Sequence, residues 1–343
     1  MGLPDADYHR YDAWSYSVIA RYARQGFSSL NTLRDPIQVT PAMRFGSLFD
    51  CMLTKRDSVL DEFTVMPTVI PEAERKALDY IASQTHESLA DIDKDTFIKY
   101  CDDCEYWRKW KYETRLSHLM QYDTYYQALC SGKTVVDAEE WKDALEIYNI
   151  FKTHPYLKTL FGNSKTEDKE YLYQLQFLVD VDIDGDKLPV KIMPDLLVVD
   201  HKMKTIQPVD LKTSSSPAYD FLDSFLRMRY DIQASLYTDV LSSIIEKDDD
   251  YWQYDILPYL FVDVGRTDKT PLTFIYDPKS ETQKDGLAYR KNGNLYTYKH
   301  WKTLLKEIVS YQKQKAKVPE GFDLNAPNDL LNLIENNEKE TQN

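Results

Sequence analysis

The chain has 343 residues, of which 43% are apolar and 29% are charged, as in an ordinary soluble globular protein. This length allows one large domain with insertions or two smaller domains. No stretch approaches about 18 uninterrupted apolar residues, which excludes a conventional membrane-spanning helix. The N-terminus, Met1 to Arg10, is polar rather than signal-like, so we expect an unanchored cytoplasmic protein.

The formal net charge of −14 constrains any function that involves nucleic acid. Nonspecific affinity for DNA comes mostly from Lys and Arg side chains that neutralise phosphates. An acidic chain can still bind DNA if its basic residues line one groove and its acids lie elsewhere. The charge alone therefore does not exclude a DNA-binding enzyme.

The first half of the chain is predicted to be mainly helical. Residues 11–55 predict two helices joined by a loop, and either Ser15 or Ser17 could cap the first of them. The second repeats apolar residues at helical spacing between residues 45 and 53. From 72 to 161 the pattern is almost wholly helical.

Strands are predicted in the second half. Residues 171–182 and 187–193 predict a hairpin around an Asp-Gly turn, and further strands are expected at 195–200 and 205–211. A long helix follows, and the remaining elements are two strands and one helix. Their expected ranges, in chain order, are 217–246, 256–264, 271–276 and 298–314.

The two strands on either side of Lys202-Met203 bring three charged residues together. If they pair as a hairpin centred there, Asp195 lies directly opposite Asp210, because both are equally far from the centre. Lys212 lies two residues beyond Asp210 and therefore points to the same face. Facing carboxylates repel each other, so on a mostly buried sheet they call for a cation.

Carboxylate oxygens suit Mg²⁺ or Mn²⁺, which also accept phosphate oxygens as ligands. A metal held in this way can polarise a phosphodiester, and a neighbouring lysine can orient or deprotonate the attacking water. The alternative is a surface hairpin with solvated charges, since an acid-x-lysine triplet often arises by chance. The apolar residues around the charges, Leu196–Val199 and Val209, favour the buried site.

Two segments carry a resemblance to a known superfamily. Pro194-Asp195 followed by Asp210-Leu211-Lys212-Thr213 resembles the PD-(D/E)XK signature of RecB-type nucleases. Residues 229–237 are similar to the helix that follows this signature, with its Q-x-x-x-Y motif. The resemblance implies an α/β fold of the restriction-endonuclease-like type, with a central mixed sheet flanked by helices and a helical insertion.

The Q-x-x-x-Y segment also has a simple geometric interpretation. Arg229, Gln233 and Tyr237 recur every four residues, so they are expected to share one face of a helix. That face could approach the strands and contact the DNA backbone or the catalytic lysine. The alternative is an ordinary amphipathic core helix.

The pattern is most similar to the RecE-like, phage-type recombination exonucleases. Ser15-Tyr16-Ser17 resembles their opening S-x-S segment, and Lys191 with Pro194-Asp195 resembles their K-x-R-P-D run. Two positions depart from the family: Asp50 stands where a histidine is expected, and Gln174 stands near the place of a glutamate. Aspartate can still bind Mg²⁺, whereas the glutamine would remove one negative charge.

The resemblance implies a role for each residue that we single out. Metal would be held by Asp195, Asp210, Asp50 and the carbonyl of Leu211. Catalysis would be completed by Lys212, Gln233 and Tyr237. DNA contacts would come from Ser15, Ser17, Thr213 and Arg229.

The resemblance further implies a place in DNA metabolism. The expected activity is a Mg²⁺- or Mn²⁺-dependent exonuclease that processes duplex DNA ends for recombination or phage DNA metabolism. The expected partners are DNA, a single-strand annealing protein and further copies of the chain in a ring, in the cytoplasm of a bacterial or phage-infected cell. No membrane partner is expected.

On the same basis, the chain is divided into four parts: an N-terminal helical part of the nuclease domain (1–70), a helical insertion (71–165), the nuclease core (166–320) and a polar tail (321–343).

Two other functions remain open. The net charge and the departures at Asp50 and Gln174 favour a nuclease fold that has become a DNA- or protein-binding component. A structure-specific endonuclease is the other alternative.

The segment from Tyr106 to Tyr112 mixes basic and aromatic residues and could stack unpaired bases. Its alternative is a helix with the tryptophans directed inward and the lysines outward.

Overall fold

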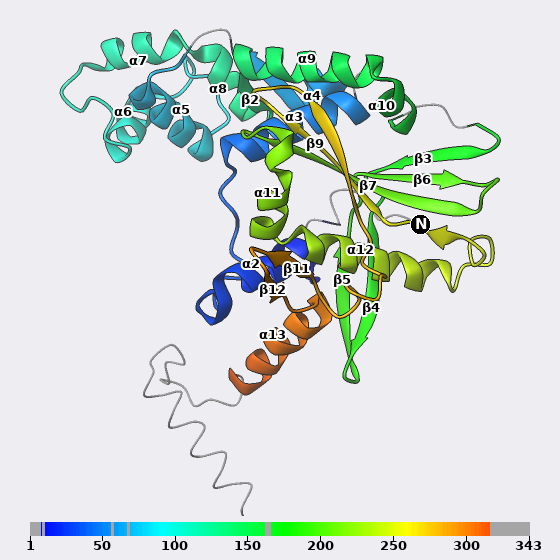
Figure 1. The fold of residues 1–343 in the computed structure, drawn as a ribbon. Helices are drawn as coiled ribbons and strands as arrows, with labels where there is room; N and C mark the ends of the chain where they lie inside the picture. Colours follow the sequence, from blue (N-terminus) through cyan, green and yellow to red (C-terminus); the bar gives the residue numbers. More distant parts are fainter. Residues whose placement is uncertain (1–7, 9–10, 56–57, 67–68, 162–165, 316–343) are drawn as a thin grey trace, which may run out of the picture.

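The structure is a computed structural model that describes residues 8, 11–55, 58–66, 69–161 and 166–315. It is a mixed α/β protein in which a multi-stranded mixed sheet is flanked by helices (Figure 1). This architecture confirms the predicted central mixed sheet. The tail expected at 321–343 lies outside the described residues. No helix in the described ranges is long and apolar enough to cross a membrane.

The central sheet has the strand order β10-β9-β7-β6-β3, with β8 paired to β7. Its strands are β3 (Lys169–Tyr173), β6 (Leu196–Asp200), β7 (Thr205–Ser214), β8 (Asp255–Ile256), β9 (Tyr259–Gly265) and β10 (Pro271–Tyr276). β7 lies in the middle, antiparallel to β6 and parallel to β9. The strands predicted between residues 195 and 276 are therefore present.

The register of β6 and β7 is the predicted one. Leu196 lies opposite Val209 and Asp200 opposite Thr205, so the hairpin is centred on Lys202-Met203. One position beyond the pair of Leu196 and Val209, Asp195 lies opposite Asp210. Because side chains alternate along a strand, this register decides which residues share the face that carries the acids.

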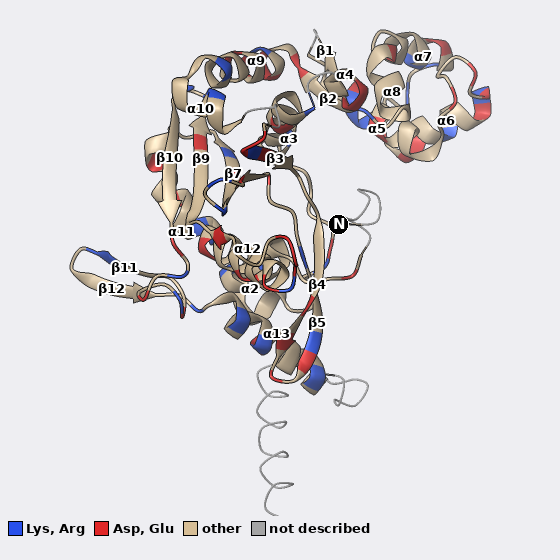
Figure 2. Cartoon of the chain, turned by 90° about the vertical axis from the view of Figure 1, so that its right-hand side faces the viewer, with Lys and Arg blue, Asp and Glu red and all other residues tan. Residues whose placement is uncertain are grey.

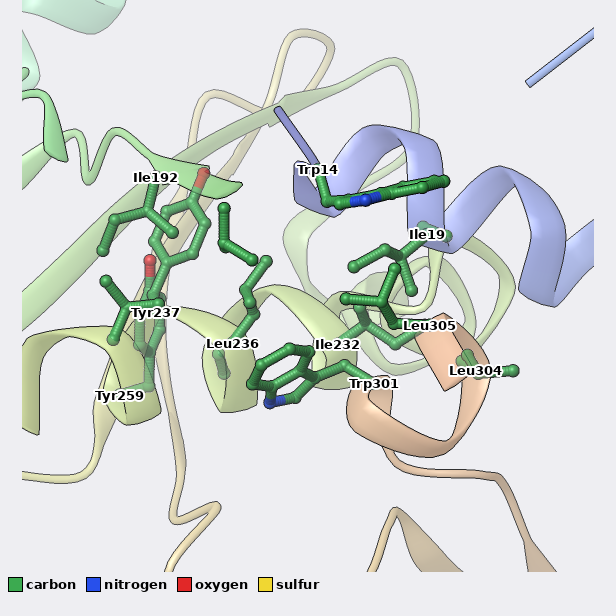
Figure 3. Packing of buried hydrophobic residues seen from close by; sticks show 14 of the residues in the cluster. Trp14, Ile19, Ile192, Ile232, Leu236, Tyr237, Tyr259, Trp301, Leu304 and Leu305 are labelled. Carbon is green, nitrogen blue, oxygen red and sulfur yellow. The ribbon is translucent and has the colours of Figure 1, made fainter. Parts of the chain in front are cut away.

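Helices cover both faces of the sheet. One face packs on α3 (Pro41–Thr54), α9 (Ala138–Thr153) and α10 (Pro155–Leu160). The other packs on α2 (Tyr16–Gln25), α11 (Phe221–Met228), α12 (Tyr230–Ile245) and α13 (Trp301–Lys315). Figure 3 shows side chains of α12, among them Ile232 and Leu236, in one cluster with Ile19 of α2 and Trp301 of α13. The sheet is thus buried on both sides, which accounts for its apolar strands.

The expected long strand at 171–182 is wrong, because it is two strands. β3 ends at Tyr173 and stays in the central sheet, while β4 (Phe177–Ile183) pairs with β5 (Asp186–Ile192) in a separate hairpin. Between them Gln174 has a left-handed φ of 48°. A non-glycine residue rarely adopts this conformation, and here it turns the chain out of the sheet.

The expected long helix at 217–246 is also divided. A 3-10 turn (Ala218–Asp220) leads into α11, and α12 begins only at Tyr230. Arg229 lies between the two helices with a φ of 61°, so the chain changes direction there. The hairpin of β11 (Ala288–Lys291) and β12 (Asn294–Thr297) was not predicted. The helix expected at 298–314 is α13.

The helical insertion has a core of its own. Its helices are α5 (Glu72–Gln84), α6 (Lys94–Asp103), α7 (Tyr112–Met120) and α8 (Asp123–Cys130). At its base lie the short helix α4 (Val59–Glu62) and the parallel strands β1 (Phe63–Met66) and β2 (Thr134–Asp137). The expectation of an almost wholly helical segment from 72 to 161 is therefore wrong at β2. Moreover, α9 and α10 belong to the main body, because they pack on the sheet.

Candidate active site

The structure brings the three charged residues of the predicted centre together. Asp195 directly precedes β6, and Asp210 and Lys212 lie in β7. The Nζ atom of Lys212 is 2.6 Å from Oδ2 of Asp210. The backbone N–H of Leu211 donates a hydrogen bond of 2.7 Å to Oδ2 of Asp195. This donor is available because the ladder between β6 and β7 ends at Val209.

Gln233, on α12, holds the acid and the lysine in fixed positions. Its amide nitrogen donates to Oδ1 of Asp210, and its carbonyl oxygen accepts from Nζ of Lys212 at 3.1 Å. The ring of Tyr230 lies 4.5 Å from the ammonium group of Lys212. The predicted approach of the Q-x-x-x-Y helix to Lys212 is thus present for Gln233.

The two departures from the family pattern meet at this site. The side-chain amide of Gln174 donates to Oδ2 of Asp50, and its backbone N–H donates to the carbonyl of Asp195 at 3.1 Å. The other oxygen of Asp50, Oδ1, is buried without a hydrogen-bond donor. Residues from α3 and from the end of β3 therefore join the acids of the hairpin.

A glycine allows α3 to approach β7. A Cβ atom at Gly46 would lie only 3.2 Å from Oγ1 of Thr213, tighter than ordinary van der Waals contact. Gly46 lies one helical turn before Asp50, so this close approach sets how far Asp50 reaches toward the strands. Thr213 itself packs against α3, on the face of the sheet opposite to Lys212.

The site concentrates negative charge. Burial, together with the nearby Asp210, raises the pKa of Asp50 to about 7. Burial, Asp210 and Asp50 raise the pKa of Asp195 well above its usual range. Burial would lower the pKa of Lys212, but Asp210, Tyr230 and Asp195 hold it well above its usual value. One cation therefore faces three carboxyl groups, and a further cation would relieve their repulsion.

The chemistry of the donors fits a hard divalent cation. Across the described ranges no three His, Cys, Asp or Glu side chains are already arranged around a common metal position. However, Oδ1 of Asp50 is buried without a donor, and Oδ2 of Asp210 meets only the ammonium group of Lys212. In a strand the C=O of a residue points to the same side as its N–H, so the Leu211 carbonyl is directed toward Asp195. Oxygen donors of this kind suit Mg²⁺ or Mn²⁺.

Sequence reasoning missed Asp263. It lies in β9 directly beside Lys212 in the parallel register of β7 and β9, and it is 2% exposed. Its Oδ1 atom has no hydrogen-bond donor, and burial raises the pKa of Asp263 to about 7 although Lys212 opposes the rise. One signal could have found it: an aspartate within an otherwise wholly apolar strand requires a reason.

Arg229 is not brought to the site. It precedes α12, so the shared helical face predicted for Arg229, Gln233 and Tyr237 is wrong for Arg229. Its guanidinium group forms an ion pair with Asp231, with two contacts of 2.9 Å, and donates to the carbonyl of Lys299. At 4% exposure this side chain anchors α12 in the core.

A cavity of about 500 Å³ adjoins the candidate site. Tyr237 lies four residues after Gln233 on α12 and forms part of its wall. Ser15 and Ser17, whose hydroxyl oxygens are 2.9 Å apart, also line it. Its lining also holds three basic residues, Arg21, Arg34 and Lys191, and two acids, Asp12 and Asp35. Because Arg34 forms an ion pair with Asp12, the cavity combines charges of both signs and carries one more cation than acid.

The protein-family models and the curated proteins with which the sequence was compared gave no match. The site is therefore interpreted from its own residues. Carboxylates that require a cation and a charged lysine fixed by a glutamine can bind a phosphate ester and activate water against it.

Proposed function

We propose that this protein is a metal-dependent nuclease of the PD-(D/E)XK type that hydrolyses phosphodiester bonds in DNA. The observation that carries the proposal is the arrangement of Asp195, Asp210 and Lys212 at the paired ends of β6 and β7, with Gln233 joined to the last two. As part of the proposal, we assign the central sheet to the restriction-endonuclease-like fold.

Four groups would hold the metal: the carboxylates of Asp195, Asp210 and Asp50 and the carbonyl of Leu211. Bound there, Mg²⁺ or Mn²⁺ would polarise the phosphodiester and lower the pKa of water. The raised pKa values of Asp50 and Asp195 support this assignment, because carboxylates that repel one another gain most from a cation. Gln174 would keep Asp50 directed toward the other acids.

Lys212 acts as a cation in this proposal. Its ammonium group lies 2.6 Å from Asp210, beside the proposed metal position, where it can orient the attacking water and offset developing charge. Gln233 is a positioning residue, because it bonds to Asp210 and Lys212 at once. Tyr237 lies one helical turn after Gln233 on α12 and forms part of the wall of the neighbouring cavity.

The cavity beside α12 supports an action on DNA. Arg21 and Lys191 can attract phosphates, and Ser15 and Ser17 can donate hydrogen bonds to them. The resemblance of the sequence to RecE-like enzymes favours an exonuclease in DNA recombination or phage DNA metabolism, acting as a homo-oligomer.

The test is cleavage of end-labelled linear duplex DNA with Mg²⁺, with Mn²⁺ and with EDTA. We compare the wild type with Lys212→Ala and with Lys269→Ala as a matched control. Lys269 has similar exposure, 23% against 20%, and pairs with Asp143 and Glu146 outside the site. We expect metal-dependent shortening by the wild type and Lys269→Ala, and a loss of about a hundredfold or more in Lys212→Ala.

Three outcomes would change or overturn the proposal. If the wild type cuts nothing with either metal, the chain is better interpreted as a binding component that retains the fold. If a covalently closed circle is cut as fast as the linear duplex, the activity is that of an endonuclease. If Lys212→Ala cuts DNA as fast as the wild type, the site around Lys212 does not catalyse the reaction.

A further inference from the structure

The loop between α6 and α7, residues 104–111, is a second unusual feature of the protein. The sequence suggested that this stretch could be a helix, but it forms turns and irregular chain. It lies at the outer end of the helical insertion, which projects from the sheet in Figures 1 and 2. The candidate active site does not use it.

The loop carries a stack of aromatic rings. Trp107 and Trp110 lie parallel, with ring centroids 4.8 Å apart and planes inclined by 11°. The ring of His118 contacts Trp110 on a tilt, with centroids 4.7 Å apart and planes inclined by 55°. Trp107, at the outer end of the stack, is 45% exposed. The stack therefore begins at the surface with a tryptophan that presents much of its area to solvent.

A buried arginine holds this loop in shape. Arg115, on α7, donates to the carbonyls of Trp107 and Arg108 at 3.1 and 2.6 Å and to the carboxylate of Asp102 at 2.7 Å. Trp107 has a φ of 40°, an unfavourable value for a bulky residue. Such strain persists only where the surroundings impose it, and it is common at binding sites.

The loop also carries cationic side chains that have no acidic partner. Lys109 and Lys111 are exposed, and neither forms an ion pair with any residue in the described ranges. Arg108, between Trp107 and Lys109, contacts Glu105 at 3.4 Å and donates two hydrogen bonds to the carbonyl of Asp102. From Asp102 to Arg115 the acids and the cations balance, so in a protein with a net charge of −14 the two unpaired lysines lie in a locally neutral segment beside an exposed indole.

We propose that this loop binds single-stranded nucleic acid, with an unpaired base stacked on the outer face of Trp107 and the backbone phosphates beside Lys109 and Lys111. A base has the flat face that would continue the stack, and its phosphates match the lysines. Duplex ligands fit less well, because paired bases hide their faces. The proposal goes beyond nuclease activity and does not depend on it.

The experiment measures binding without cleavage. Full-length protein carrying Lys212→Ala is titrated in EDTA with fluorescein-labelled oligothymidylate, and anisotropy and tryptophan quenching are recorded. Adding Trp107→Ala is expected to weaken binding by about 5- to 150-fold, the contribution of one stacked base. Replacing Lys109 and Lys111 by Ala is expected to lower the slope of log affinity against log salt by about 1.4. Oligouridylate and a blunt DNA hairpin serve as competitors.

Trp252→Ala is the matched control. Trp252 is more exposed, at 62%, but lies in an acidic turn after Asp248, Asp249 and Asp250. The Trp252→Ala variant should bind oligothymidylate as tightly as the protein that carries Lys212→Ala alone. The proposal is overturned if Trp107→Ala does so too, if Trp252→Ala weakens binding equally, or if the hairpin competes as well as the single strand. If oligouridylate binds more tightly than oligothymidylate, the natural ligand of the loop is RNA. If oligothymidylate binds more tightly, the natural ligand is DNA.

Discussion

Replacing Asp263 by Asn removes one buried carboxylate and hardly changes the shape of the side chain. Asp263 is 2% exposed, lies beside Lys212 in the register of β7 and β9, and has one oxygen without a donor. An ionised carboxyl group in this position has lost its water without gaining a full set of hydrogen bonds, which costs free energy. We therefore expect Asp263→Asn to stabilise the fold wherever the wild-type group is ionised.

The size and sign of this effect follow from the pKa. Burial raises the pKa of Asp263 from 3.8 to about 7. At about 1.36 kcal/mol for each pKa unit, ionisation costs the folded state about 4 kcal/mol in full. A carboxyl group whose pKa is raised on folding has no cost below its unfolded pKa, and stability is lost as the pH rises toward the folded value. Between about pH 5 and about pH 8 the wild type should lose about 2 to 3 kcal/mol from this group.

The assay is urea unfolding followed by far-ultraviolet circular dichroism, in EDTA, at several pH values across this range. The advantage of Asp263→Asn over the wild type should grow as the pH rises. Asp143→Asn is the control of opposite sign, because the ion pairs with Lys269 and Arg266 lower the pKa of Asp143 against the effect of burial. It should be less stable than the wild type throughout. An advantage of Asp263→Asn that is the same at every pH would refute the reasoning.

Three further predictions concern the polar contacts. Gln233→Leu leaves Oδ1 of Asp210 and Nζ of Lys212 without their amide partner, so the free energy of unfolding should fall by about 1 to 3 kcal/mol in urea titrations, together with the rate of cleavage. Asp50→Asn should weaken Mn²⁺ binding in calorimetry, and in EDTA its stability advantage over the wild type should grow as the pH rises from about 4 to about 7, because it removes a buried carboxyl group whose pKa is raised on folding; unchanged metal affinity would exclude Asp50 as a ligand. Arg115→Ala should destabilise the protein by about 2 kcal/mol or more and shift its tryptophan emission, because three buried hydrogen bonds are lost. An unaltered emission spectrum would show that the loop does not need this clamp.

The sequence by itself determined the centre of the candidate site. Asp195, Asp210 and Lys212 could be placed on one face because strand side chains alternate with a period of two and the hairpin is symmetric about Lys202-Met203. Such a register depends only on residues close in the chain. The same holds for Gln233, whose position on a helix after the strands follows from local periodicity.

Local patterns failed where the backbone takes a rare conformation. The strand expected at 171–182 and the helix expected at 217–246 are each broken at one residue, Gln174 and Arg229, with φ values of 48° and 61°. Neither residue is a glycine, and nothing in the local sequence signals a left-handed turn. The turns are imposed by contacts made far along the chain, from Gln174 to Asp50 and from Arg229 to Lys299.

Only the tertiary structure decided which other groups join the centre. Asp50 reaches it because Gly46 lets α3 lie close to β7, and Asp263 reaches it because β9 pairs in parallel with β7. Trp107 is exposed because Arg115 holds its loop open at the edge of the insertion. Each of these placements joins residues that are distant in sequence or conformations that propensity opposes. The periodicity of one segment therefore carries no information about them.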